Sequence, residues 1–210
     1  MEPLGRKIRA VRTGELAIDV EVPGFTSPVR ITGTVLQATW NGESVWLAYR
    51  VGKFDTAKHF LEPWIQVVLA ACGRHAHRAC VVDQENPDQP KLRPAYDAEE
   101  AAILLRNLID GCVQGRVRPL CYGPITSDAY ADAFARTGRE WDDGPDPDAL
   151  ASASGKWNEA GRNRPPGEGL AASALLAWRD QDPFLFDADW HKWARHIARP
   201  LRAWFKPNND

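Results

Sequence analysis

The stretch that decides the fold is residues 15–51, ELAIDVEVPGFTSPVRITGTVLQATWNGESVWLAYRV. In its first eight residues apolar side chains occupy every second position, a pattern typical of a half-buried strand. Residues 29–38 and 45–51 are two further strand-like runs. The dipeptide Asn41-Gly42 between them is the preferred sequence of a two-residue hairpin. The stretch therefore predicts three antiparallel strands.

Beyond residue 51 the apolar spacing changes to three and four residues, which is typical of amphipathic helices. The predicted elements are a helix over 54–72 containing Pro63, a strand over 79–83, a polar loop over 86–94, a helix capped by Asp97 that closes at Gly111 or Gly115, a helix over 127–136 capped by Thr126 or Ser127, and a helical tail over 187–205 kinked at Pro200. This order predicts an α/β (α+β) fold, a mixed central sheet flanked by helices.

A length of 210 residues fits a single domain. Within it we expect a sheet-and-helix core over residues 14–138, a loop-rich acidic, Pro- and Gly-containing segment over 139–169, and C-terminal helices over 170–210. Lys and Arg number 26 against 28 Asp and Glu, so no global positive field attracts nucleic acid. No apolar run reaches the roughly 20 residues of a membrane span. Four scattered cysteines favour a reducing, cytoplasmic location.

Two strand ends carry a resemblance. Gly33-Thr34-Val35-Leu36 closes one strand and Ala48-Tyr49-Arg50 closes the next, with an amphipathic helix following. This order resembles the core of the PD-(D/E)XK nucleases, in their RecB-type branch. In active members the first strand ends on Asp, and the second carries an acid, one spacer and Lys. The resemblance places these three functions at Leu36, Ala48 and Arg50.

The residues at these positions lack the groups that metal-dependent DNA cleavage requires. A strand places residues i and i+2 on one face, so the acid and the Lys of active members share a pocket. The two carboxylates there hold Mg²⁺, which requires hard oxygen ligands. Leu36 and Ala48 have none. We therefore expect a nuclease-like core without catalytic residues, metal or cofactor.

An ordered series of short segments is similar to the C-terminal domain of RecC, the gamma subunit of exodeoxyribonuclease V. The segments are 30–35, Lys58-His59 with Trp64 to Cys72, 118–120, 126–131, Lys156-Trp157, Gly167-Glu168, Pro200-Leu201 and Trp204-Phe205. The resemblance, over residues 14–205, implies a non-catalytic domain that holds subunits and guides DNA in an ATP-dependent helicase–nuclease. Its implied partners are a RecB-like subunit, a RecD-like helicase, and DNA through the complex.

Other readings remain open. Asp19 with Glu21 and Asp83 with Glu85, near Lys91, are carboxylate pairs that a free-standing metal-dependent nuclease would use. The alternative is a solvated strand face and a strand-ending loop. A third reading is an autonomous module that binds single-stranded nucleic acid.

Residues 72–80 contain Cys72, His75, His77 and Cys80 in a symmetrical arrangement. Four such ligands could surround zinc. The alternative is two buried cysteines flanking exposed histidines in an ordinary connection.

Cationic side chains form two candidate DNA-binding groups. The first lies near the nuclease-like positions and comprises Arg50, Lys53, Lys58 and His59. The second is a stripe along the tail, His191, Lys192, Arg195, Arg199 and Arg202, for which a solvated helix face is the alternative. Trp190, Trp193 and Trp204 lie on the opposite face of the tail, where we expect core or interface anchors.

Overall fold

The computed structural model describes residues 13–40, 43–50, 56–75, 78–83, 91–160, 166–179 and 181–206. Their contacts group into two compact units, residues 1–106 and residues 107–210. The boundary lies inside the helix α3 (Ala98–Gly115).

Unit one is built around a mixed sheet of five strands in the order β1-β2-β3-β4-β5. The pairs β1–β2, β2–β3 and β4–β5 are antiparallel, whereas β3 and β4 are parallel. The helix between β3 and β4 makes the crossover that a parallel pair requires. The elements are β1 (Thr13–Val22), β2 (Val29–Trp40), β3 (Glu43–Arg50), α2 (Ala57–Cys72), β4 (Arg78–Asp83), β5 (Lys91–Arg93) and the first part of α3. The predicted mixed sheet flanked by helices is confirmed.

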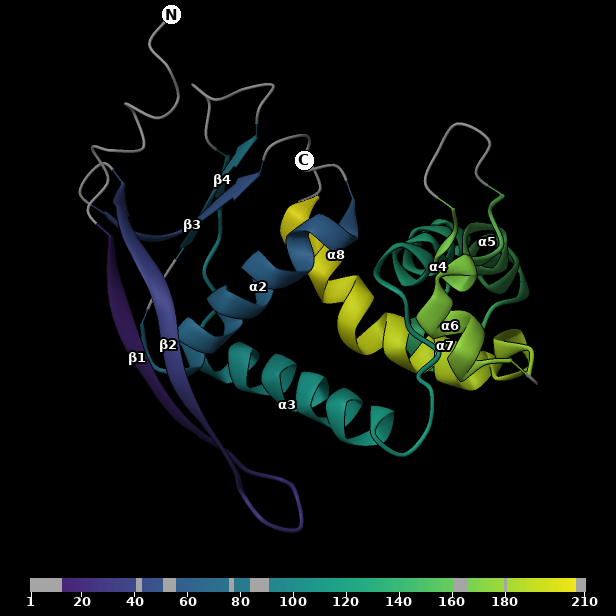
Figure 1. Cartoon of the computed structure of the whole chain (residues 1–210), viewed down its shortest axis with the longest axis horizontal. Helices are drawn as coiled ribbons and strands as arrows, with labels where there is room; N and C mark the ends of the chain where they lie inside the picture. Colours follow the sequence, from purple (N-terminus) through teal and green to yellow (C-terminus); the bar gives the residue numbers. More distant parts are fainter. Residues whose placement is uncertain are drawn as a thin grey trace, which may run out of the picture. The chain divides into compact units, whose positions relative to one another are not determined.

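The strands β1 and β2 form a long curved ribbon (Figure 1). Their ladder runs without a break from the pair Thr13–Ala38 to the pair Val22–Val29. The ladder of β2 and β3 ends at the pair Trp40–Glu43, the residues that flank the predicted hairpin turn. Asn41 and Gly42 themselves lie outside the described residues.

The helix α2 packs its apolar side against the sheet (Figure 1). Trp64 at its centre is fully buried, and its indole N–H donates to the hydroxyl of Tyr96, 2.8 Å away. Pro63 lies inside the helix, as predicted. Downstream, the Asp97 carboxylate accepts a 2.8 Å hydrogen bond from the backbone N–H of Glu100, which confirms Asp97 as the cap of α3.

One local prediction in unit one is wrong. Residues 91–93, within the predicted loop 86–94, form the short strand β5, which pairs with β4 through Ala79–Arg93, Cys80–Leu92 and Val81–Lys91. Three residues are too few for a pattern of alternation to be recognised, and the pairing itself supplies the structure.

Unit two is helical. Its elements after α3 are α4 (Pro124–Thr137), η1 (Trp141–Asp143), α5 (Pro147–Trp157), η2 (Glu168–Leu170), α6 (Ala172–Ala177), η3 (Pro183–Leu185), α7 (Asp187–Trp193), η4 (Ala194–Ala198) and α8 (Arg199–Phe205). The helices α4 and α5 lie side by side (Figure 1). The helix α5 falls within the segment 139–169, which the sequence predicts to be rich in loops, and it ends at Trp157.

The cap of α4 also differs from the prediction. Thr126 and Ser127, the expected caps, are fully buried inside the helix. The helix begins at Pro124, and the carboxylate of Glu168 accepts hydrogen bonds from the backbone N–H groups of Ile125 and Thr126, at 3.1 and 2.9 Å. A negative charge at a helix N-terminus satisfies unpaired donors and complements the helix dipole.

The tail is helical over the predicted range, but its middle is not a regular α-helix. Residues 194–198 form a π-helical turn that joins α7 to α8. Pro200 follows directly and has no N–H to bond to the carbonyl group of His196, so the regular α-helical ladder is interrupted here. Within the described ranges, no helix combines the length and the apolar character that crossing a membrane requires.

Candidate functional site

The nuclease-like positions lie on the strands β2 and β3. Of the three predicted positions, Ala48 is buried, with 3% of its surface exposed, and so is Val35, the neighbour of Leu36 in β2, with 2%. Ala48 is paired with Val81 of β4, which is equally buried. This part of the sheet is therefore lined by aliphatic side chains that pack in the core.

The strand register separates two positions that the resemblance brings together. Ala38 pairs with Val45, so even-numbered β2 positions share a face with odd-numbered β3 positions. Position 48 therefore shares its face with position 35 and lies on the opposite side of the sheet from position 36. The side chains of Leu36 and Arg50 lie outside the described set.

The face that carries Ala48 does not fit a magnesium ion. Mg²⁺ requires oxygen ligands in near-octahedral geometry, and Val35, Ala48 and Val81 supply none. Nowhere among the described residues do three His, Cys, Asp or Glu side chains come together as a possible metal site. Neither position 36 nor position 35 changes this conclusion, since both residues are aliphatic.

Asp19 and Glu21 lie two positions apart on one exposed face of β1, whereas Glu85, the predicted partner of Asp83, lies outside the described residues. Asp19 lies on an exposed face of β1 and holds Arg30 in a two-pronged ion pair at 2.5 and 2.7 Å. The hydrogen bond from Arg30 lowers the pKa of Asp19. Asp83 belongs to β4, which is separated from β1 by two strands, a spacing of roughly 14 Å. The two residues are too far apart to hold one ion.

The cysteines of the possible zinc group have raised thiol pKa values. Burial raises the pKa of Cys72 and of Cys80 to about 11, whereas zinc binds thiolates. Cys72 ends α2 and Cys80 lies in the interior of β4. His77 lies outside the described residues, and His75 follows Arg74, which has a left-handed backbone at φ 61°.

The first cationic group is partly described. Lys58 and His59 lie in the first turn of α2, a turn that contains no acidic residue. Lys58 is exposed and His59 is half-buried. Lys53 lies outside the described residues, and for Arg50 only the backbone position beside Asp83 is described.

Each cation of the tail stripe has a partner inside unit two. His191 is buried, with its Nδ1 3.1 Å from the Tyr130 hydroxyl and its Nε2 donating to the carbonyl of Trp141 at 2.8 Å. The other contacts are Lys192 with Asp110 at 3.1 Å, Arg195 with Asp142 at 2.5 Å, Arg202 with Asp128 at 2.7 Å and with Asp132, and Arg199 over the ring of Trp141 at 5.6 Å. The stripe binds the tail to the rest of its own unit.

The three tail tryptophans are core residues. Trp190, Trp193 and Trp204 are exposed by 0%, 1% and 2%. Trp190 stacks on Phe184 with ring centroids 4.9 Å apart, and its indole N–H donates to the carbonyl of Pro183. Within the described part of unit two these side chains occupy core positions, and their role as interface anchors stays a prediction. The apolar stripe faces helices of the same unit.

Sequence reasoning missed the contacts that organise unit two. Tyr130 connects His191 to the loop before α5, because its hydroxyl also accepts a hydrogen bond from the backbone N–H of Asp146. Gly169 packs so closely on the indole of Trp157 that a Cβ there would overlap it. The sequence signal for this contact is the Gly-Glu-Gly triplet at 167–169, but glycines are common in loops and do not reveal which side chain they pack against.

Comparison with known proteins agrees with the resemblance over part of the chain. The family model described as RecC C-terminal domain matches residues 1–135, which is 135 of the 210 residues. The match includes the whole sheet and ends within α4 (Pro124–Thr137), whereas the sequence resemblance predicts similarity as far as residue 205. No curated protein matches the chain. The chain belongs to the RecC C-terminal domain family, the family of the exodeoxyribonuclease V gamma subunit.

Proposed function

We propose that this chain is a non-catalytic scaffolding domain of an ATP-dependent helicase–nuclease of the exodeoxyribonuclease V type, acting in the repair of double-strand breaks by recombination. The RecC family belongs to a complex with helicase and nuclease activity. In this proposal the other subunits hydrolyse ATP and DNA. This chain holds them together and helps to guide the separated strands.

The observation that carries the proposal is the buried aliphatic face at Val35 and Ala48. Hydrolysis of DNA by the metal-dependent route needs carboxylates that fix an ion next to the scissile phosphate. The sheet has packed this region as core, with Val81 beside Ala48. This packing is consistent with a domain that acts by binding other subunits, and it is not consistent with a domain that cleaves DNA with a metal ion.

The proposed partners are a RecB-like helicase–nuclease subunit and a RecD-like helicase. For DNA, we propose that contact is made by the first cationic group, Arg50, Lys53, Lys58 and His59. The exposed Lys58 beside a helix N-terminus without acidic residues supports this choice. We rank the tail cations lower, because their charge is already offset by carboxylates or covered by an aromatic ring. They are Lys192, Arg195, Arg199 and Arg202.

Assembly is the experiment that tests the scaffolding role. The tagged 210-residue chain would be expressed with the RecB-like and RecD-like subunits of its own organism, purified and analysed by sedimentation. We expect a complex of fixed stoichiometry that degrades linear duplex DNA with ATP. If the chain sediments alone at micromolar concentrations of all subunits, the proposal is wrong.

A further inference from the structure

Unit two exposes a concentrated apolar surface between residues 170 and 186. We call it the α6 patch, and it comprises Leu170, Leu175, Leu176, Leu185 and Phe186, which are exposed by 44%, 54%, 69%, 77% and 37%. Isolated exposed leucines are ordinary on protein surfaces, whereas several large apolar side chains exposed by one short segment are a reason to look for a binding surface there.

The helix at the centre of the patch depends on outside contacts. Helix α6 (Ala172–Ala177) has the sequence ASALLA, and none of its six residues is buried. A helix this short is not stable by itself, and helices in proteins are normally stabilised by burying an apolar face. In the described part of unit two, the leucines of α6 are not buried against any other element.

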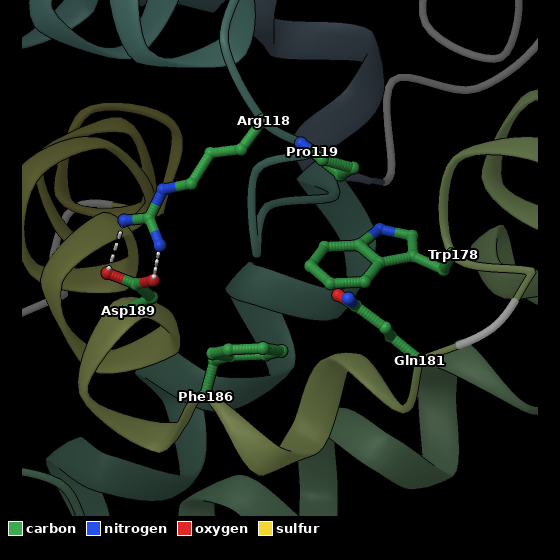
Figure 2. A pocket seen from close by; sticks show the side chains of 6 residues that line it. All are labelled: Arg118, Pro119, Trp178, Gln181, Phe186 and Asp189. Atoms are coloured by element: carbon green, nitrogen blue, oxygen red, sulfur yellow. Dashed lines mark hydrogen bonds and ion pairs between the residues drawn. The ribbon is translucent and has the colours of Figure 1, made fainter.

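A small pocket opens beside the patch (Figure 2). It has a volume of about 260 Å³ and is lined by Arg118, Pro119, Trp178, Gln181, Phe186 and Asp189. The rings of Trp178 and Phe186 lie 6.0 Å apart at a tilt of 45°. Sites for small molecules usually enclose roughly 300–1,000 Å³, so this pocket suits a single inserted side chain.

The charges around the patch decide which class of macromolecule it fits. Arg118 is neutralised by Asp189 at 2.9 Å, on one side of the pocket (Figure 2). Asp182 and Asp187 are exposed, and their carboxylates accept hydrogen bonds from the backbone N–H groups of Phe184 and Ala188. These two carboxylates outnumber the one exposed cation between residues 170 and 186, Arg179, and so favour a positively charged partner over a DNA backbone.

We propose that the α6 patch binds an amphipathic segment of a partner subunit. One aliphatic or aromatic side chain of that segment enters the pocket between Trp178 and Phe186, its neighbours cover Leu176 and Leu185, and Lys or Arg residues lie over Asp182 and Asp187. This inference rests on the proposed scaffolding function and names the surface that performs it. The patch lies outside residues 1–135, so the family match does not assign it.

The test uses the full chain with the same subunits. Leu176→Glu combined with Leu185→Glu would remove the apolar contact, and Asp187→Asn would remove one rim charge while retaining an acceptor for Ala188. Val113→Glu is the matched control, because Val113 is 52% exposed, belongs to the same unit and lies in α3, outside the patch and the pocket lining. Thermal unfolding of all variants should match that of the unaltered chain, since the substituted side chains are exposed.

We expect the double variant to bind the partner subunits at least about tenfold more weakly, the loss that truncation of an interface anchor produces. Asp187→Asn should reduce the salt dependence of binding, and Val113→Glu should bind normally. If the double variant binds as tightly as the unaltered chain, this inference is wrong and the scaffolding proposal stands. If the unaltered chain binds no subunit, both the scaffolding proposal and this inference are wrong.

Other occupants of the patch give different results. If the chain alone forms a dimer that Leu176→Glu disrupts, the occupant is a second copy and the inference is overturned. The inference is likewise overturned if the double variant loses affinity for single-stranded DNA but retains its affinity for the subunits.

Discussion

Ala38 of β2 is paired with Val45 of β3, and this register determines which strand positions share a face with Ala48. Alternation along each strand places Val35 and Ala48 together and position 36 on the other side. Val35 and Ala48, the two side chains that share this face, are both aliphatic and both buried.

The first prediction concerns this face. Replacing Ala48 with Glu should lower the free energy of unfolding by about 3–5 kcal/mol, because it leaves a buried charge without a partner. Urea unfolding of the two proteins measures the difference. Thr34→Glu, on an exposed β2 position, is the control for adding charge and should cost far less. Equal stability of Ala48→Glu and the unaltered chain would show that this position is open to solvent.

The second prediction concerns pH. Asp146 caps α5 (Pro147–Trp157), and its carboxylate accepts 3.0 Å hydrogen bonds from the backbone N–H groups of Asp148 and Ala149 and pairs with Arg139. The bond from Ala149, with help from Arg139, lowers the pKa of Asp146. A carboxylate whose pKa is lowered by folding stabilises the folded state at every pH above its ordinary pKa, near 3.8. This stabilisation is lost as the pH falls through the folded-state pKa.

Asp146→Ala should therefore cost about 1–2 kcal/mol of unfolding free energy at neutral pH, the usual value of a helix cap. The cost should shrink as the solution is acidified below a pH of about 3.9, the ordinary Asp pKa. Asp146→Asn, which retains the acceptor oxygen, should cost less at neutral pH. Chemical denaturation at several pH values measures all three proteins, and a cost independent of pH would contradict the assignment.

The third prediction concerns the loop around Glu168. Glu168→Ala removes the acceptor for the N–H groups of Ile125 and Thr126 and should destabilise unit two by about 1–2 kcal/mol. Gly169→Ala should also destabilise it, because the added Cβ would overlap the indole of Trp157. Gly155, which has open space where a Cβ would stand and lies in α5, is the matched control, and Gly155→Ala should stabilise the helix slightly.

The fourth prediction separates the two cationic groups. Lys58→Glu should weaken binding of single-stranded DNA and reduce the salt slope by about one, without affecting thermal unfolding. Arg202→Ala should lower the thermal unfolding temperature and leave DNA binding unchanged, because Arg202 is an internal ion-pair partner of Asp128 and Asp132. Fluorescence anisotropy over a series of salt concentrations measures the binding. DNA affinity that depends on Arg202 but not on Lys58 would contradict our choice of group.

The sheet could be predicted from the sequence because its signals are local. The alternation over 15–22 and the Asn41-Gly42 pair are contained within short windows, and β1, β2 and β3 follow from them. The cap at Asp97 was predicted for the same reason, since its partner Glu100 is three residues away.

The interior of unit two could not be predicted in this way. Glu168 meets Thr126 across 42 residues, and Arg202 meets Asp128 across 74. No window of sequence contains both members of either pair. The tail cations were therefore read as a surface stripe, although each has a partner elsewhere in the unit. The amphipathic pattern of the tail was correct, but pattern alone does not tell a core from an interface.

The most direct test of the central claim is a cleavage assay with the purified 210-residue chain by itself. Linear duplex and single-stranded DNA would be incubated with the chain across a range of Mg²⁺ and Mn²⁺ concentrations. Our account predicts that both DNAs stay intact throughout. Metal-dependent cleavage that copurifies with the chain and disappears in Asp19→Asn would contradict it.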